Sequence, residues 1–129
     1  MNTNMHGRDC PTFHLSLPVP SVRESVEFFT DVLGATVSHR SPCGYVNVDW
    51  YGAQITLAEG VLPEKLAGVH FGVNLDLDTF QTVSNRILST PSVDVVAEPQ
   101  VVDADTEMER RKMYVRCPAG YLIEIKGYR

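Results

Sequence analysis

Cysteine is scarce in this sequence, and none of it has the spacing of a paired site. The three residues, Cys10, Cys43 and Cys117, cannot all pair within one chain, and no Cys-x-x-Cys is present. A disulfide framework needs an even set of cysteines at regular spacings. We therefore expect free thiols in a reducing compartment, the cytoplasm.

Long apolar runs and large basic clusters are also missing. No apolar run approaches the roughly 20 residues of a membrane span, and residues 1–9 contain no apolar signal core. The net charge is −5, from 11 basic and 16 acidic residues, and the longest basic run is Arg110-Arg111-Lys112. We expect no secretion and neither nucleic acid nor membrane as a partner.

The composition is that of an ordinary globular chain. Of the 129 residues, 43% are apolar and 21% are charged, which is enough to build a hydrophobic core. The length predicts a single domain over residues 1–129.

The first half of the chain predicts a strand, a helix and three strands. Residues 13–19 alternate apolar and polar side chains, which is typical of a half-buried strand. Ser21 and Glu24 form a capping box, apolar residues follow at helical spacing, and Gly34 is placed to end the helix. Three strand-like runs come next, at residues 35–40, 45–51 and 53–59.

The same order starts again after a connector at residues 60–66. Residues 69–75 alternate, Asp78 and Gln81 form a weaker capping pair, and helical spacing continues to Leu88. Three further strands are predicted at residues 93–97, 112–117 and 121–126. The polar residues 99–110 have no clear period and predict a long loop, of the kind that often forms a lid.

The order β-α-β-β-β is thus present twice, over residues 12–59 and 67–128. Overlay of the two copies aligns His14 with His70 and Thr56 with Glu124. Strand parity places all four on the face away from the apolar side chains. We expect an α+β fold in which the two βαβββ modules form a curved mixed sheet around a shared metal cleft.

The expected cleft contains two imidazoles and one carboxylate, from His14, His70 and Glu124. Such a set suits Fe(II), Mn(II), Ni(II) or Zn(II) and leaves coordination positions open. A single His or Glu on a strand is more often a surface residue, so the prediction depends on the symmetry of the three positions.

Other polar residues share this parity, and an exposed strand face is the simpler explanation for each of them. They lie on the cleft face or at its rim: Asn47, Asp49, Gln54, Lys112, Arg116 and Lys126. Of these, Asn47, Gln54, Lys112 and Arg116 are, with Thr56, the candidate substrate-binding residues.

Two segments carry a resemblance to a known family. Phe13-His14-Leu15-Ser16-Leu17-Pro18-Val19, followed by residues 25–34, resembles the opening module of the vicinal oxygen chelate superfamily. Residues 114–125 resemble its closing hairpin. That superfamily includes glyoxalase I, fosfomycin-resistance and bleomycin-resistance proteins and extradiol dioxygenases. Residues 48–54, 69–73 and 124–128 are more narrowly similar to small proteins described as predicted extradiol dioxygenases.

The resemblance covers about residues 12–128 and implies roles for particular residues. It implies that His14, His70 and Glu124 bind a divalent metal, with Fe(II) favoured, and that Tyr114, ten residues before Glu124, contacts substrate as a catalytic residue. Glyoxalase I has a further glutamate ligand at the position of Thr56. A hydroxyl there counts against glyoxalase chemistry, and the acid/base histidine of larger extradiol dioxygenases is missing.

Two classes of function remain open at this point. The first is a metal-dependent enzyme: an Fe(II)-dependent, dioxygenase-like oxidoreductase that binds substrate through vicinal oxygens, or alternatively a glyoxalase-type lyase or isomerase. The second is a bleomycin-resistance-type protein that binds a small molecule without catalysis. We also expect a homodimer, because the strand edges of small modules need cover; the site is then built from one chain or from two.

Overall fold

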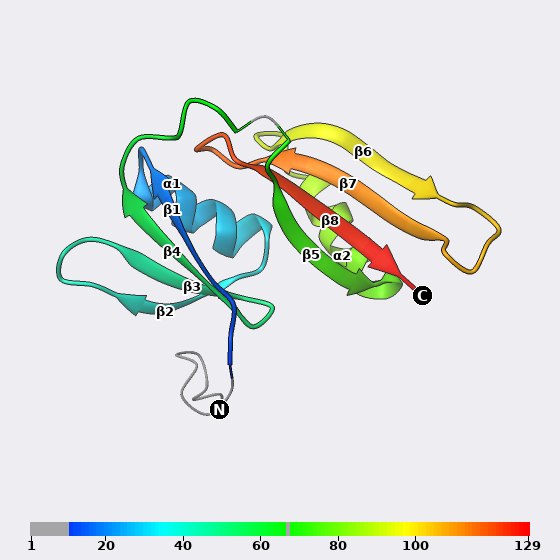
Figure 1. The fold of residues 1–129 in the computed structure, drawn as a ribbon, viewed down its shortest axis with the longest axis horizontal. Coiled ribbons are helices and arrows are strands. Elements are labelled where there is room, and N and C mark those ends of the chain that lie inside the picture. Colours follow the sequence, from blue (N-terminus) through cyan, green and yellow to red (C-terminus); the bar gives the residue numbers. More distant parts are fainter. Residues whose placement is uncertain (1–10, 67) are drawn as a thin grey trace. The chain divides into compact units, whose positions relative to one another are not determined.

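The computed structural model of this chain describes residues 11–66 and 68–129. It divides into two compact units, with the boundary between Pro63 and Glu64. The described part of each unit contains a four-stranded mixed sheet and helical turns in βαβββ order (Figure 1). The predicted α+β class and its repeated module are confirmed.

The first unit begins with β1 (His14–Val19), followed by α1 (Val22–Glu27) and the π-helical turn η2 (Phe28–Val32). Three strands complete it: β2 (Thr36–Arg40), β3 (Val46–Trp50) and β4 (Ala53–Glu59). Their order across the sheet is β1-β4-β3-β2, with β1 parallel to β4 and the other pairs antiparallel.

The predicted helix boundaries of the first unit are confirmed. The Glu24 amide donates to the Ser21 hydroxyl oxygen over 3.2 Å, which satisfies one of the free amides at the helix start. Gly34 follows η2 with φ +79°, a left-handed conformation that glycine adopts without strain. The buried Trp50 indole then donates to the Leu33 carbonyl over 3.1 Å, which ties β3 to the end of the helix.

The second unit contains β5 (Phe71–Asp76), α2 (Leu77–Leu88) and three further strands. These are β6 (Asp94–Val102), β7 (Arg110–Arg116) and β8 (Leu122–Tyr128). The sheet order is β5-β8-β7-β6, with β5 parallel to β8. It repeats the order of the first sheet.

The core of the second unit lies between α2 and one face of its sheet. The helix contributes Phe80, Val83 and Ile87, all buried. The sheet contributes fully buried side chains from β7 and β8: Met113, Val115, Ile123 and Ile125. Phe80 packs so closely on β8 that a Cβ at Gly127 would lie 2.7 Å from its Cβ.

The predicted loop at residues 99–110 is wrong. β6 continues through Pro99 to Val102, and Val102 pairs with Arg110 at the start of β7. Register shifts between Val95 and Gln100 interrupt the two-residue alternation, because each bulge moves the side chains that follow to the other face. The alternation of apolar and polar residues is therefore lost in the sequence, although β6 stays paired with β7.

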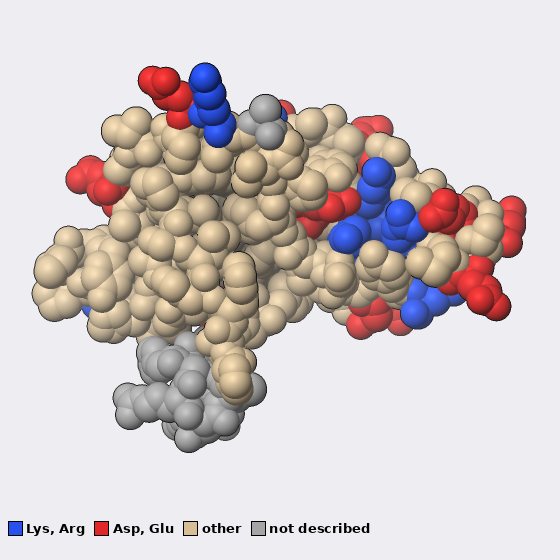
Figure 2. Space-filling model, in the orientation of Figure 1, with Lys and Arg blue, Asp and Glu red and all other residues tan. Residues whose placement is uncertain are grey.

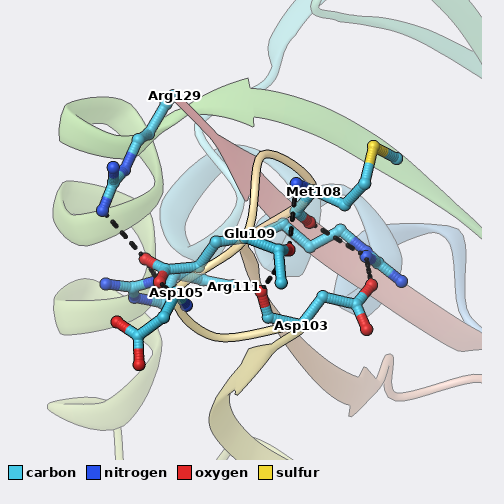
Figure 3. A network of polar contacts seen from close by, with 8 residues as sticks. Asp103, Asp105, Met108, Glu109, Arg111 and Arg129 are labelled. Atoms are coloured by element: carbon cyan, nitrogen blue, oxygen red, sulfur yellow. Dashed lines mark hydrogen bonds and ion pairs between the residues drawn. The ribbon is translucent and has the colours of Figure 1, made fainter.

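The remaining turn of this hairpin is held by its own polar side chains together with Arg129 at the end of the chain (Figure 3). Arg110 pairs with Asp103 at 2.6 Å. Glu109 accepts from the Asp105 amide at 2.8 Å and pairs with Arg111 and Arg129 at 3.0 and 3.1 Å. These contacts lower the pKa of Glu109, the Asp105 amide contributing most, so the carboxylate that holds the turn together remains charged.

The predicted capping pair of the second helix is also corrected. Asp76, two residues earlier than Asp78, is the N-cap, and its carboxylate accepts from the Thr79 amide over 2.7 Å. The helix thus begins directly where β5 ends, without a separate loop. With only 12 residues, α2 is too short for a bilayer, and no other described helix is long and apolar enough to cross one.

Asp76→Ala is expected to lower the melting temperature at pH 7, because the Thr79 amide loses its acceptor. Its hydrogen bond with that amide lowers the pKa of Asp76. The stabilisation is therefore complete above the unfolded-state pKa and is lost as the pH falls through the lower folded-state value. Melting curves should show the difference between wild type and variant narrowing from about pH 5 to pH 2.

The matched control is Asp78→Ala, which removes an exposed carboxylate from the first turn of the same helix. It should melt close to the wild type throughout this pH range. Equal melting temperatures for Asp76→Ala and wild type at pH 7 would contradict the assignment of the cap.

Candidate metal centre

Glu124 is a buried carboxylate on the sheet face of the second unit that is turned away from α2. Its neighbours along β8, Ile123 and Ile125, are fully buried toward the helix, so alternation directs Glu124 to the opposite face. Only 9% of the residue is exposed. A carboxylate this buried needs charged or hydrogen-bonding partners.

His70 provides the first of these partners. Its Nε2 lies 3.2 Å from Glu124 Oε1, and its Nδ1 lies 3.3 Å from the Gly68 carbonyl oxygen. A carbonyl can only accept, so Nδ1 donates to Gly68. The contact between Nε2 and the carboxylate then needs either a proton on Nε2 or a cation shared by the two atoms, because two lone pairs would repel each other. Metal-binding histidines are commonly held in this way, through the nitrogen that does not bind the metal.

Tyr114 provides the second partner. It is the register partner of Glu124 on β7, and its ring meets the His70 ring edge to face, with centroids 5.5 Å apart. Burial raises the pKa of Tyr114, and a hydrogen bond with Glu124 and the charge of that carboxylate raise it further. The phenol therefore stays protonated at neutral pH and donates to Glu124.

The equivalent positions of the first unit keep the histidine but have no carboxylate. His14 is the exposed first residue of β1, and its register partner on β4 is Gln54. Thr56, half-buried on β4, donates its hydroxyl to Asn47 Oδ1 over 2.6 Å. This pair faces away from the buried Val48 and Ile55.

Strand registers in the two units agree with the overlay of the copies. Thr56 pairs with Ser16 on β1 and with Asn47 on β3. Glu124 pairs with Gly72 on β5 and with Tyr114 on β7. His14 and His70 each lie two residues before the first of these partners. The backbone thus repeats, and only the side chains differ.

The other predicted substrate-binding residues have different surroundings. The Lys112 ammonium lies 5.7 Å from the centre of the Tyr114 ring, beside the Glu124 group. Arg116 instead donates to the Gly120 carbonyl over 2.9 Å, so it braces the turn between β7 and β8. Asn47 and Gln54 remain half-buried on the first unit.

The donor set fits a divalent cation, although neither unit holds a complete ligand set alone. Among the described residues, no three His, Cys, Asp or Glu side chains lie together. Two ligands of one ion are about 3.4 Å apart around tetrahedral zinc and about 3.0 Å apart in octahedral geometry. The 3.2 Å between His70 Nε2 and Glu124 Oε1 falls between these values.

A hollow in the first unit lies away from these residues. It has a volume of about 590 Å³ and is located where β1 and β4 end, whereas His14 begins β1. Its lining consists of Pro20, Ser21, Val22, Cys43, Gly44, Tyr45, Ala58 and Glu59. None of the predicted site residues is among them.

A comparison with protein families agrees with the repeated module. The model of the Glyoxalase/Bleomycin resistance protein/Dioxygenase superfamily matches residues 12–125. The chain belongs to this superfamily. No curated protein sequence matches the chain.

Solved structures with the superfamily's fold cover nearly the whole chain. A glyoxalase/bleomycin resistance protein/dioxygenase from Alicyclobacillus acidocaldarius is 20% identical, with a TM-score of 0.75 and coverage of 91% of this chain and 90% of that one. A fosfomycin resistance protein, FosX, from Listeria monocytogenes, solved with Mn(II) and a sulfate ion, is 17% identical, with a TM-score of 0.71 and coverage of 90% and 88%.

Sequence reasoning did not single out Gly72, which places β5 against the candidate centre. A Cβ at this position would overlap the carbonyl oxygen of Glu124. The close approach of the two strands therefore requires glycine here. The available signal was the overlay itself, which aligns Gly72 with a serine in the first copy.

Gly72→Ala is expected to cost about 1–3 kcal/mol of unfolding free energy and to displace Glu124 from His70. Ser16→Ala is the matched control, because Ser16 has the same register position in the first unit and is exposed. It should stay within about 0.5 kcal/mol of wild type. Urea unfolding measures both, and equal midpoints for the two variants would contradict the close approach.

Proposed function

We propose that the chain is a metal-dependent enzyme in which His14, His70 and Glu124 hold a divalent cation. The observation that carries the proposal is the pairing of His70 Nε2 with Glu124 Oε1 at 3.2 Å, with Nδ1 facing the Gly68 carbonyl. His14 has the position of His70 in the repeated register. The proposal requires both units, from one chain or from two copies.

The reaction class that we propose is extradiol-dioxygenase-like, with Fe(II) as the favoured metal. A bound cation with open positions would act as a Lewis acid and template for a small molecule with vicinal oxygens, and iron would add redox chemistry with O₂. Three protein ligands leave such positions open. The Mn(II)-containing FosX structure supports a divalent metal on this fold.

The chain's own side chains have distinct roles in this proposal. Tyr114 remains protonated, donates to Glu124 and thereby holds the carboxylate in one orientation. In this proposal its hydroxyl would also contact the chelating substrate. Thr56, already bound to Asn47, offers a neutral hydroxyl and leaves one side open. Glyoxalase-type proton transfer would lack its carboxylate base there.

A homodimer is part of the same proposal. β1 and β5 each stand at the edge of their own sheet, and sheet edges favour pairing or cover. His14 begins one of these edge strands, and His70 directly precedes the other. Light scattering at micromolar concentration measures the association.

His14→Ala, His70→Ala and Glu124→Ala are each expected to weaken Mn(II) binding by more than about 100-fold, because even the outer partners of metal ligands contribute 10–100-fold. Calorimetric titration measures the affinity, and circular dichroism checks the fold. His39→Ala is the control, since His39 is an exposed histidine that packs against Tyr45. Full affinity in any one ligand variant removes that residue from the site.

Catalysis is tested separately from metal binding. Protein reconstituted anaerobically with Fe(II) is screened for oxygen uptake over catechols and related diols, with His70→Ala as the inactive reference. Uptake that needs both the diol and His70 supports a dioxygenase. If wild type binds Fe(II) tightly but takes up no oxygen with any diol, this reaction class is contradicted. If wild type binds no metal at all, a non-catalytic binding protein is favoured.

Thr56→Glu is expected to add a fourth ligand, a second carboxylate, because position 56 has the register of Glu124. Calorimetry should show tighter binding of Ni(II) or Zn(II), since a carboxylate is a stronger donor than a hydroxyl. Oxygen uptake should fall because an open position is filled. Thr56→Gln is the neutral control of similar size. Equal Ni(II) affinity for wild type and Thr56→Glu would mean that position 56 does not face the metal.

A further inference from the structure

Two lysines stand directly opposite each other on the same sheet face as Glu124. Lys112 on β7 and Lys126 on β8 are register partners, and both are half-buried. Residues opposite each other in an antiparallel pair share a face, with Cβ atoms about 5 Å apart. Like charges in this arrangement repel each other and destabilise the sheet.

Neutral amides extend this pair across the whole sheet. Asn74 on β5 is the register partner of Lys126, and Gln100 on β6 is the partner of Lys112. Across the sheet, in the strand order β5-β8-β7-β6, the side chains at this level are therefore an amide, two ammonium groups and a second amide. We call these four residues, Asn74, Lys126, Lys112 and Gln100, the lysine row. Every member can donate hydrogen bonds through its side chain.

No carboxylate of the described residues forms an ion pair with either lysine. The ion pairs of the second unit join Arg110 to Asp103, Arg111 and Arg129 to Glu109, and His70 to Glu124. The ammonium groups lie instead over aromatic rings on opposite sides of the lysine pair, Lys112 over Tyr114 and Lys126 over Tyr128. Figure 2 shows basic side chains gathered over β7 and β8.

This concentration of positive charge is local, because the chain as a whole has a net charge of −5. Along β7 and β8 the lysine row lies two residues from the row that contains Glu124 and Tyr114, which is a distance of about 7 Å. That is within the length of a small molecule. The two side chains lean apart toward their rings, and an anion that accepts from both ammonium groups would draw them together and balance their charge.

We propose that the lysine row binds an anionic group of the substrate, a carboxylate or a phosphoryl group. The substrate is then a small acid whose vicinal oxygens lie at the candidate metal and whose anionic end lies about 7 Å away. This inference rests on the proposed function, which supplies the chelating end. Lys112 and Lys126 bind and orient the molecule, and neither takes part in proton transfer.

The test uses metal-free protein, so that anion binding is measured apart from the metal. Sodium phosphate and sodium acetate are titrated separately into ¹⁵N-labelled protein at constant ionic strength, and amide shifts are followed by NMR. We expect shifts in β7 and β8. The double variant Lys112→Gln/Lys126→Gln should bind the tighter of the two anions at least about tenfold more weakly, since two charge-assisted contacts are lost. The anion that binds more tightly identifies the group.

Two control variants separate a specific site from general charge. Lys112→Arg/Lys126→Arg keeps both charges and should retain the affinity within about threefold. Lys65→Gln removes an exposed lysine near the start of the same unit and should bind like wild type. Equal affinity in wild type and the double glutamine variant, or no binding of either anion to wild type, would overturn the inference.

Thermal unfolding gives a second readout of the same double variant. In anion-free buffer its melting temperature should equal or exceed that of wild type, because the repulsion is gone. The tighter anion should raise the melting temperature of wild type and leave that of the variant unchanged. A variant that melts lower than wild type and still responds to the anion would contradict the lysine row as the site.

Mn(II) titration distinguishes the failure of this inference from the failure of the proposed function. Lys112→Gln/Lys126→Gln should keep its Mn(II) affinity, since neither lysine is a ligand. Wild type that binds the anion through the lysines but takes up no Mn(II) would overturn the metal-dependent function and leave the anion site standing. If wild type binds Mn(II) but no anion, the anion site is overturned and the metal-dependent function stands.

Discussion

Burial of one sheet face against helical turns is the constraint on which both units depend. Because side chains alternate along a strand, fully buried residues such as Val48, Ile55 and Ile123 commit their neighbours to the opposite face. Those neighbours include the polar residues of the candidate site. The order β1-β4-β3-β2 and its repeat β5-β8-β7-β6 then place them in rows across the sheet, so a core requirement also aligns the candidate site.

The buried carboxylate of Glu124 is the most demanding element of that face. Only 9% of the residue is exposed, so an unpaired charge there would destabilise the folded chain. His70 and Tyr114 compensate for this from two other strands or their ends. The three side chains hold one another in place before any ligand binds, which is the preorganisation expected of a binding centre.

The two units share a backbone and differ in chemistry. Where the second unit has Glu124 and Tyr114, the first has Thr56 and Asn47, joined by a neutral hydrogen bond. Where the second has Gly72, the first has Ser16. The second unit thus carries the charged groups of its sheet face, the two lysines included, whereas the first carries the imidazole of His14 and neutral donors. In the proposed site this inequality would keep a coordination position open, which a second carboxylate would fill.

Much of the fold followed from local patterns in the sequence. Alternation gave the faces of β1, β4 and β8, the capping box at Ser21 gave the start of α1, and the repeat gave the equivalence of His14 with His70. These signals are local because each depends on residues within a few positions of one another. The pairing of His70 with Glu124 was expected only through the symmetry of the copies, and its geometry came from the structure.

Tertiary structure alone decided the features that depend on strand register. The bulges of β6 hid a paired strand behind an aperiodic sequence, and the N-cap at Asp76 was set by where β5 ends. The need for glycine at position 72 and the opposition of Lys112 to Lys126 arise from hydrogen bonds between strands far apart in sequence. No local pattern encodes such a register, because the bulges and hairpins between the strands determine it.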